Sequence, residues 1–325
     1  MGGVSIDNRN TIDWRGALEA AWERRHSVAA RATFADDCEA YRLLHGWSEG
    51  IFGLEIDRYG EVALIRGKQE YNDALPAIAE ALEALHPWQA ILAKPWRGSA
   101  PEALSGELPA DPVVVKEHGL RFAVELSQPA NPGLHLDARV PRRWLASSDR
   151  CVDRRVLNLF AFTGSLGVAA MAGGARVVHI DSQRGALTRC ARNHELNGQR
   201  VDQRDLLRGN IFQHLKRSRK RQRFGGIICD PPPYPAGTKT PTAPKRLESV
   251  AGLASLTAPL LEERGWLMLL FHDHGRSHDE HEAEAIAGAA SSAVTLVAKE
   301  RFVSDDDYPA DTPDHQLRVS VLERR

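Results

Sequence analysis

The chain has 325 residues and a formal net charge of −1 at pH 7, enough length for two domains with separate cores but no overall charge to attract nucleic acid or membrane, so any RNA contact requires a local patch. The four cysteines (Cys38, Cys151, Cys190, Cys229) lie far apart without a CxxC pair, which predicts no disulfide framework, no zinc site and no metal. No apolar run approaches ~20 residues and the first ten residues lack a signal peptide's apolar core, so we expect a soluble, cytoplasmic protein with no membrane partner.

The N-terminal part of the chain predicts a small α+β domain. Residues 11–45 show apolar positions at helical spacing, with Thr11 or Asp13 as the cap. Glycine-punctuated short strands follow as far as residue 60, where Arg58 is expected to pair with a nearby acid.

The next stretch completes this domain. A helix is predicted over 71–88, ended by a proline, and a loop rich in Pro, Gly and Ala over 95–111. Two strands about a Glu-His-Gly turn are predicted over 113–124. We place the domain boundary near residue 127, and a helix carrying Arg142 and Arg143 follows, for which Asp137 is a candidate cap.

Residues 156–181 form the most informative stretch. An apolar run that includes Leu157 and Leu159 predicts a buried parallel strand, which enters a small turn ending at Gly164. An Ala-rich helix and a second buried strand follow, and that strand ends on Asp181. Strand, glycine turn, helix, strand and terminal acid form the first half of a nucleotide-binding α/β unit, in which the glycine admits the ligand and the acid can hold both ribose hydroxyls.

The elements after Asp181 continue an α/β alternation. A helix is predicted over 186–197 and a third strand with its loop over 201–212. The basic run over 216–223 lacks interleaved aromatics, so a solvated helix face is the default interpretation and contact with an RNA backbone is the alternative.

The last third of the chain supplies the remaining strands. Residues 224–229 form an apolar strand that ends in Asp230-Pro231-Pro232, with Tyr234 close behind. A loop with three prolines over 235–246, a helix over 247–263 and a strand over 265–271 follow. The final strands are predicted over 294–298 and 317–322, joined by an acidic loop over 304–313.

Open parallel sheets bind ligands at the carboxyl ends of their strands, which brings Gly164, Asp181, Asn210 and Asp230 into one crevice. There the Asp230 carboxylate can accept hydrogen bonds from a target amine, and Tyr234 offers a ring for stacking on a flat base. We therefore take Asp230 and Tyr234 as the candidate catalytic residues.

These stretches resemble the class I S-adenosylmethionine-dependent methyltransferases, and in detail the family of 23S rRNA cytosine-C5 methyltransferases and its relatives. The resemblance implies S-adenosyl-L-methionine as the cofactor. It implies an α/β fold over 128–325, a Rossmann-like methyltransferase sheet with helices on both faces, and a smaller α+β domain over 1–127 similar to the family's middle domain. Many relatives begin with a small RNA-binding domain, whereas this sequence starts at the middle domain.

The resemblance also carries individual residues. Gly133, Asp137 and Arg139 match the segment that closes over the cofactor in the family, although Ala138 replaces the usual glutamine. Asn210 occupies the position whose acid binds the adenine amino group, and an amide oxygen can still accept from an amine. The implied cofactor-binding residues are Gly133, Asp137, Arg139, Asn158, Phe160, Thr163, Gly164, Asp181, Ser182, Asn210, Ile211 and Asp230.

One departure from the family bears on the chemistry. Cytosine-C5 enzymes add a cysteine thiolate to C6 of the ring, because C5 is not nucleophilic enough unaided. In this chain Asp273 stands at the place of that cysteine, between His272 and His274, which could relay a proton. The prediction is therefore methylation of a base at nitrogen, which needs no covalent adduct, with oxygen as the alternative.

The leading hypothesis is a methyltransferase acting on a base in RNA, with ribosomal RNA as the expected partner. The alternatives are a methyltransferase of a small molecule or another macromolecule on the same scaffold, and a non-catalytic protein that binds S-adenosylmethionine or RNA. The sequence leaves the oligomeric state open, including a homodimer.

Overall fold

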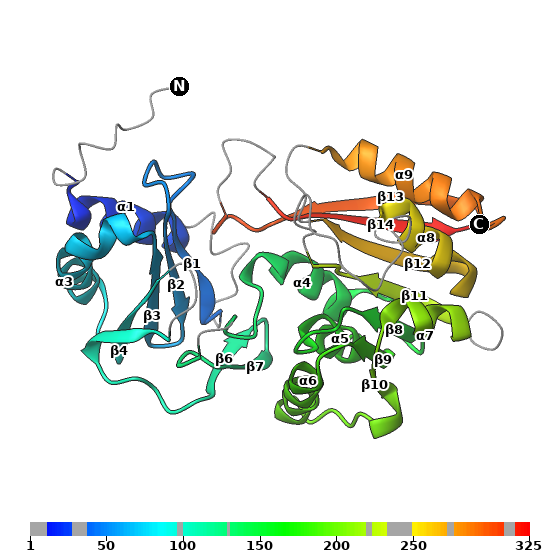
Figure 1. The fold of residues 1–325 in the computed structure, drawn as a ribbon, viewed down its shortest axis with the longest axis horizontal. Coiled ribbons are helices and arrows are strands. Elements are labelled where there is room, and N and C mark those ends of the chain that lie inside the picture. Colours follow the sequence, from blue (N-terminus) through cyan, green and yellow to red (C-terminus); the bar gives the residue numbers. More distant parts are fainter. Residues whose placement is uncertain are drawn as a thin grey trace. The chain divides into compact units, whose positions relative to one another are not determined.

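The computed structural model describes residues 12–27, 38–95, 100–128, 131–218, 223–232, 249–271, 276–308 and 316–325. The chain divides into two compact units (Figure 1). The first comprises Met1–Asp137 with Asp305–Asp311, and the second comprises Ala138–Ser304 with Thr312–Arg325. The boundary predicted near residue 127 precedes this division, and no sequence pattern predicted that a segment near the C-terminus belongs to the first unit.

The first unit contains a five-stranded sheet in the order β1-β2-β3-β4-β5, with only β3 and β4 parallel. Helices α1 and α3 pack on it through a core that includes Leu18, Ile56 and Leu82. The helices are α1 (Trp14–His26), η2 (Gln69–Ala74) and α3 (Leu75–Leu85), and the strands are β1 (Ala40–His45), β2 (Leu54–Tyr59), β3 (Val62–Gly67), β4 (Ala90–Pro95), β5 (Glu102–Gly106), β6 (Val113–Glu117) and β7 (Leu120–Val124).

Two secondary-structure predictions for this unit are wrong. The helix expected over 11–45 ends at His26, and Ala40–His45 forms a strand because its backbone pairs with β2 and all six residues are buried. The loop expected over 95–111 contains β5, a mostly exposed edge strand whose polar residues show no buried face. The helix over 71–88 and the hairpin over 113–124 are confirmed.

Local contacts predicted for the first unit are also confirmed. The Asp13 side chain caps α1 by accepting from the Gly16 amide at 3.0 Å. The Arg58 guanidinium pairs with the Glu61 carboxylate at 3.1 Å.

A buried ion network joins the strands of the first unit. The Asp57 side chain is fully buried and accepts from the guanidinium groups of Arg42 at 2.5 Å and Arg66 at 2.6 Å. Burial would raise the pKa of Asp57, but the two cations hold it below its usual value. Both arginines also reach the half-buried Glu55. The carboxylate of Asp57 is therefore the only fully buried anion of this network.

The segment Asp305–Asp311, which belongs to the first unit, supplies further contacts to Arg42 and to Arg25 of α1. The Asp307 carboxylate accepts from the Arg42 amide at 2.9 Å, and the Asp307 carbonyl accepts from the Arg25 guanidinium at 3.0 Å. The Arg42 guanidinium also lies 4.9 Å from the centre of the Tyr308 ring. Strand β1 thus has polar partners supplied from more than 260 residues further along the chain.

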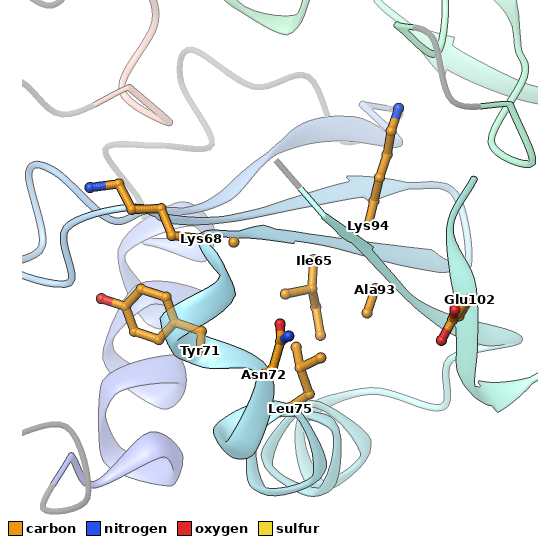
Figure 2. Close-up of a pocket in the computed structure, with 9 residues that line it drawn as sticks. Ile65, Lys68, Tyr71, Asn72, Leu75, Ala93, Lys94 and Glu102 are labelled. Carbon is orange, nitrogen blue, oxygen red and sulfur yellow. The ribbon is translucent and has the colours of Figure 1, made fainter. Parts of the chain in front are cut away.

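The first unit also holds a pocket of about 300 Å³ (Figure 2). It is lined by the side chains of Ile65, Tyr71, Asn72 and Leu75 together with Lys68, Lys94 and Glu102. None of the site residues predicted from the sequence belongs to this lining.

The second unit contains a seven-stranded sheet in the order β10-β9-β8-β11-β12-β14-β13. The strands from β10 to β12 are parallel, and β14 runs antiparallel to both of its neighbours. The strands are β8 (Arg155–Leu159), β9 (Arg176–Asp181), β10 (Leu206–Arg208), β11 (Phe224–Cys229), β12 (Leu261–Phe271), β13 (Leu296–Val303) and β14 (Arg318–Arg324). The helices are α4 (Arg139–Ser147), α5 (Ser165–Ala172), α6 (Arg184–Leu196), η4 (Gln203–Asp205), α7 (Ile211–Ser218), α8 (Val250–Thr257), η6 (Ala258–Leu260) and α9 (His278–Ala290). The short helix η3 (Leu136–Ala138) spans the division between the two units.

The two faces of this sheet are covered by different helices. Alternate strand residues such as Leu157, Ile180 and Cys229 share one apolar core with α7, α8 and α9. The residues between them, including Asn158 and His179, face the side of α5 and α6. The prediction of a Rossmann-like α/β sheet with helices on both faces is confirmed.

Several element boundaries in the second unit differ from the prediction. The third strand expected within 201–212 has only three residues, because Ile211 already begins α7. The helix expected over 247–263 gives way at Leu261 to β12. Helix α9 was not predicted, and a capping box of Ser277 and Glu280 begins it. The N-cap of α4 is Ala138 rather than Asp137.

Within the described part of the chain, no helix is both long and apolar enough to span a bilayer.

Candidate functional site

The carboxyl ends of four neighbouring parallel strands lie level with one another. Leu159 of β8 pairs with Ile180 of β9 and Cys229 of β11, and Arg208 of β10 pairs with Asp181. The residues that follow, Phe160 and Asp230, therefore stand beside Asp181 at one edge of the sheet. Neighbouring strands are about 4.8 Å apart, so the backbones of Asp181 and Asp230 are separated by roughly 10 Å.

Strand order changes direction at β8, since β9 leads away on one side and β11 on the other. Open α/β sheets bind their ligands outside the strand ends at such a switch point. The strand register places Asp181 and the residue before Asp230 at this edge of the second unit. The convergence of Gly164, Asp181, Asn210 and Asp230 in one crevice stays a prediction.

The turn between β8 and α5 has an unusual backbone. Phe160, Phe162 and Gly164 have positive φ angles of 56°, 48° and 79°. A side chain on Gly164 would bring its Cβ within 2.3 Å of Cys190 Sγ, so only glycine fits there. Positive φ at the two phenylalanines costs roughly 1–3 kcal/mol each, and such strain concentrates at ligand sites.

Hydrogen bonds from Asp181 hold this turn. One carboxylate oxygen accepts from the Phe162 amide at 2.9 Å, and the other accepts from the Gln183 amide at 2.8 Å. The side chain is 9% exposed. A carboxylate oxygen has two acceptor sites, so each oxygen can accept one further hydrogen bond, which matches the two hydroxyls of a ribose.

Other predicted cofactor residues occupy mixed positions around this edge. Asn210 is half-buried, and its side-chain oxygen accepts from the Gln213 amide at 3.2 Å, at the start of α7. Ile211 packs in the core, Thr163 is buried with its carbonyl accepting from Asn193, and Ser182 is exposed. Their roles toward a cofactor stay predictions.

Asn158 is the penultimate residue of β8, but its side chain points away from the crevice. Its side chain is 1% exposed and points into the helix layer, where its amide nitrogen lies 3.3 Å from Nδ1 of His179. The sequence-based grouping of Asn158 with the cofactor residues thus has no support from its surroundings in the structure.

The segment expected to close over the cofactor spans the division between the units. Gly133 (φ 112°) and Asp137 belong to the first unit, and Gly133 donates its amide to the Asn131 side chain at 2.9 Å. Arg139 begins α4 in the second unit and is fully buried. Their shared role stays a prediction.

Of the two residues predicted to be catalytic, Asp230 directly follows β11, is half-buried and precedes Pro231 and Pro232. Tyr234 and the segment His272-Asp273-His274 lie outside the described residues.

The three cysteines of the second unit, all among the described residues, are buried and do not offer a thiolate at this edge. Cys229 points into the core, and burial, together with Asp230, raises the pKa of its thiol far above neutrality. Burial also raises the pKa of Cys151 and of Cys190 to about 12. Cys38 belongs to the first unit, where its Sγ lies 3.5 Å from the Ala40 carbonyl.

Sequence reasoning missed a buried cluster of His179, Cys190 and His194 behind the glycine turn. The prediction of no metal site considered only the spacing of cysteines, and it missed this cluster because two of its three members are histidines. The available signal was the spacing of four between Cys190 and His194, which places both on one face of a helix.

Comparison with known proteins places these features in context. Residues 60–259 match the family described as S-adenosylmethionine-dependent methyltransferase. The Ribosomal RNA large subunit methyltransferase I of Cronobacter sakazakii is 32% identical over 246 residues, covering 71% of this chain and 60% of that protein. The protein of the same name from Escherichia coli O1:K1 / APEC is 30% identical over 291 residues, covering 86% and 71%. The chain thus spans about 60% of the length of the first of these relatives.

Solved structures resemble the whole chain in fold. The crystal structure of SMU.776 complexed with SAH aligns with a TM-score of 0.84 at 19% identity, covering 99% of this chain and 83% of that one. The SAM-dependent methyltransferase from Agrobacterium tumefaciens aligns with a TM-score of 0.63 at 18% identity, covering 89% and 91%.

Proposed function

This chain belongs to the S-adenosylmethionine-dependent methyltransferase family, and we propose that it transfers a methyl group from S-adenosylmethionine to a ring or exocyclic nitrogen of a base in ribosomal RNA. The observation that carries the proposal is the Asp181 carboxylate, which is fixed by two backbone amides beside the glycine turn.

The residues at the strand ends fit the cofactor. Asp181 can accept from both ribose hydroxyls, and the absence of a side chain at Gly164 keeps the turn compact. Asn210 is the candidate for contact with the adenine, through the second acceptor site of its side-chain oxygen. When bound, S-adenosylmethionine supplies an electrophilic methyl group on a sulfonium.

For the transfer itself, the protein must position the nucleophile and accept one proton. The Asp230 carboxylate follows β11 and stands level with Phe160, next to the glycine turn. It can accept a hydrogen bond from a base amine, orient the nitrogen lone pair and take up the proton that the amine loses. The Asp-Pro-Pro sequence stiffens the chain behind it.

The state of the cysteines favours nitrogen over cytosine C5. A C5 methyltransferase needs a thiolate that adds to the ring. Cys229, next to Asp230, is fully buried with a raised pKa and faces the core shared with α7–α9. A nitrogen nucleophile needs no such adduct.

The assignment of ribosomal RNA rests on the two relatives described above, both named Ribosomal RNA large subunit methyltransferase I. A local basic surface agrees with an RNA partner. Lys216 and Arg217 are exposed on the last turn of α7 and begin the basic run over 216–223. Lysine and arginine at such a site pair with phosphates without reading the base.

The proposed function can be tested by mass spectrometry of ribosomal RNA nucleosides from cells with and without the gene. We expect one N-methylated nucleoside to disappear in the deletion strain and to return when the purified protein and S-adenosylmethionine are added to that RNA. RNA containing 5-fluorocytosine should form no covalent adduct. A stable adduct would overturn nitrogen methylation, and unchanged RNA nucleosides would favour a small-molecule substrate.

Replacing Asp181 by alanine should weaken cofactor binding by roughly 10–150-fold, because it removes a charged acceptor worth about 1.5–3 kcal/mol. Calorimetric titration with S-adenosylhomocysteine measures the change. Asp181→Asn keeps one acceptor oxygen for the glycine turn and should lose less. The exposed Glu195 on α6 gives the control Glu195→Ala. Unaltered affinity in Asp181→Ala would contradict the assignment of the ribose site.

A further inference from the structure

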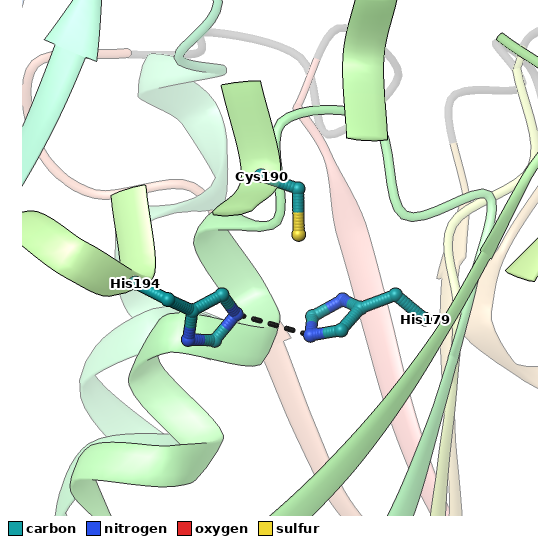
Figure 3. Close-up of side chains that lie close together, drawn as sticks. All are labelled: His179, Cys190 and His194. Atoms are coloured by element: carbon teal, nitrogen blue, oxygen red, sulfur yellow. Dashed lines mark hydrogen bonds between the residues drawn. The ribbon is translucent and has the colours of Figure 1, made fainter. Parts of the chain in front are cut away.

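Three potential metal ligands converge in the interior of the second unit, on the sheet face opposite the core shared with α7–α9. His179 comes from β9, whereas Cys190 and His194 come from one face of α6. Their exposed fractions are 0%, 0% and 1%, and their ligand atoms all lie within 4.8 Å of one another. Figure 3 shows the Cys190 thiol pointing toward the space between the two imidazole rings.

The hydrogen bonds of His194 fix which of its ring nitrogens carries a lone pair. Its Nδ1 lies 2.7 Å from the side-chain oxygen of Gln199, and the Gln199 amide nitrogen donates to the Val168 carbonyl at 3.0 Å. With that amide oriented by Val168, the Nδ1 of His194 must carry the hydrogen. The Nε2 of His194 therefore presents its lone pair to the cluster.

His179 has a partner of the same kind on its outer side. Its Nδ1 faces the Asn158 amide at 3.3 Å, and the Asn158 side-chain oxygen is buried without a hydrogen-bond partner among the described residues. Rotating this amide by 180° brings the oxygen to Nδ1, which then carries the hydrogen and leaves Nε2 of His179 as a second lone pair. A cation at His179 Nε2 requires this second orientation, because Nε2 then carries no hydrogen and Nδ1 needs an acceptor.

This arrangement is characteristic of metal centres. A histidine that binds a metal through one nitrogen usually donates its other N–H to an oxygen, which fixes the ring. Both histidines have an amide side chain at Nδ1, and their Nε2 atoms face each other at 3.0 Å. When two imidazoles bind one ion through metal–nitrogen bonds of about 2.0–2.1 Å, the two nitrogen atoms lie roughly 3.3–3.6 Å apart. The Nε2 atoms of His179 and His194, at 3.0 Å, would therefore need to separate only slightly to admit an ion.

Charge selects the metal. The thiol of Cys190 is buried with its pKa raised to about 12, and it must lose its proton to bind a metal. One thiolate and two neutral imidazoles balance a monovalent cation, whereas a divalent ion would leave a net charge in the core, which is costly. Thiolate ligands suit both Cu(I) and Zn²⁺, and imidazole suits copper and zinc, so the charge balance is what favours the monovalent Cu(I).

We propose that His179, Cys190 and His194 form a buried site for one Cu(I) ion, with Asn158 and Gln199 orienting the two imidazoles. Binding breaks the Cys190 S–H bond, forms one Cu–S and two Cu–N bonds and releases one proton to solvent, with no change in oxidation state. Without the ion, His179 Nε2 donates its hydrogen to His194 Nε2 and Nδ1 accepts from the Asn158 amide, which leaves the Asn158 oxygen without a partner among the described residues. On binding, the His179 hydrogen moves from Nε2 to Nδ1 and the Asn158 amide rotates to accept it.

The test is an anaerobic titration with Cu(I) against a chromogenic chelator, with a thiol-free reductant present. Because the site is buried, the protein is loaded both as folded and during refolding from urea. We expect one ion per chain at an affinity at least ten times above that of a Cys190→Ser variant. X-ray absorption of the loaded wild-type protein should show one sulfur and two nitrogen ligands.

Matched variants separate this site from other thiols. Cys151 is equally buried but belongs to no group of three or more possible metal ligands among the described residues, so Cys151→Ser should bind copper as the wild-type protein does. The wild-type absorption spectrum decides the outcome if Cys190→Ser does not fold. Equal binding in a folded Cys190→Ser, a spectrum without sulfur, or tighter binding of Zn²⁺ than of Cu(I) would overturn the proposal.

Discussion

Asp230→Ala is expected to lower the rate of methyl transfer by about 10²–10⁴-fold while cofactor affinity stays within about threefold of the wild-type value. The carboxylate at the end of β11 is the proposed acceptor for the base amine and its proton, and an acceptor that acts in the transition state affects turnover more than binding. Single-turnover transfer of labelled methyl groups to RNA from the deletion strain measures the rate, and calorimetry measures cofactor affinity.

Asp230→Asn supplies a sharper variant, because it keeps the shape and one acceptor oxygen but cannot accept the proton. Its rate should fall between those of the wild-type protein and Asp230→Ala, with a changed pH dependence. Glu195→Ala, at an exposed acid of α6, is the control for an altered surface charge. Wild-type turnover in Asp230→Ala would remove this residue from the mechanism.

Asp57→Ala should destabilise the first unit by about 3–5 kcal/mol, because it leaves the buried Arg42 without its shortest ion pair and the half-buried Arg66 without one of its two carboxylates. The half-buried Glu55 contacts both arginines and limits the loss. Urea unfolding followed by tryptophan fluorescence measures the effect. The exposed Asp73 gives the control Asp73→Ala, expected within about 0.5 kcal/mol of wild type.

The pH dependence of the same pair provides a second readout. Because the folded-state pKa of Asp57 lies below its unfolded value, its stabilising effect is present above about pH 4 and is lost as the pH falls through the folded value. Asp57→Ala lacks this contribution, so the difference between the two proteins should shrink in acid. A cost under about 1 kcal/mol at pH 7, or a difference that grows in acid, would contradict the role of this network.

The sequence allowed the second sheet to be predicted better than the first. Parallel strands buried on both faces appear as apolar runs, and β8, β9 and β11 each ended at a recognisable glycine turn or acid. Strand β1 was mistaken for helix because all six of its residues are buried, so no alternation marks it. Strand β5 carries almost no buried side chains, and α9 is rich in alanine without a clear apolar stripe.

The same limits apply to the site. Glycine and acid positions at strand ends could be predicted because the backbone itself places them. The direction of the Asn158 side chain could not be predicted, because it depends on which face of the sheet the even-numbered residues of β8 occupy. In the structure Asn158 lies opposite His179 of β9, so both side chains point to the same face. Contacts between elements distant in sequence, such as His179 with His194, leave no local pattern beyond helical spacing.

The return of Asp305–Asp311 to the first unit has a consequence for biosynthesis. A ribosome delivers Arg25 and Arg42 early, yet their partner Asp307 is translated only after nearly all of the second unit. Until then the first unit lacks this segment, and the Arg42 amide of β1 lacks the Asp307 carboxylate as its acceptor. The full set of contacts of the first unit can therefore form only after most of the second unit has been synthesised.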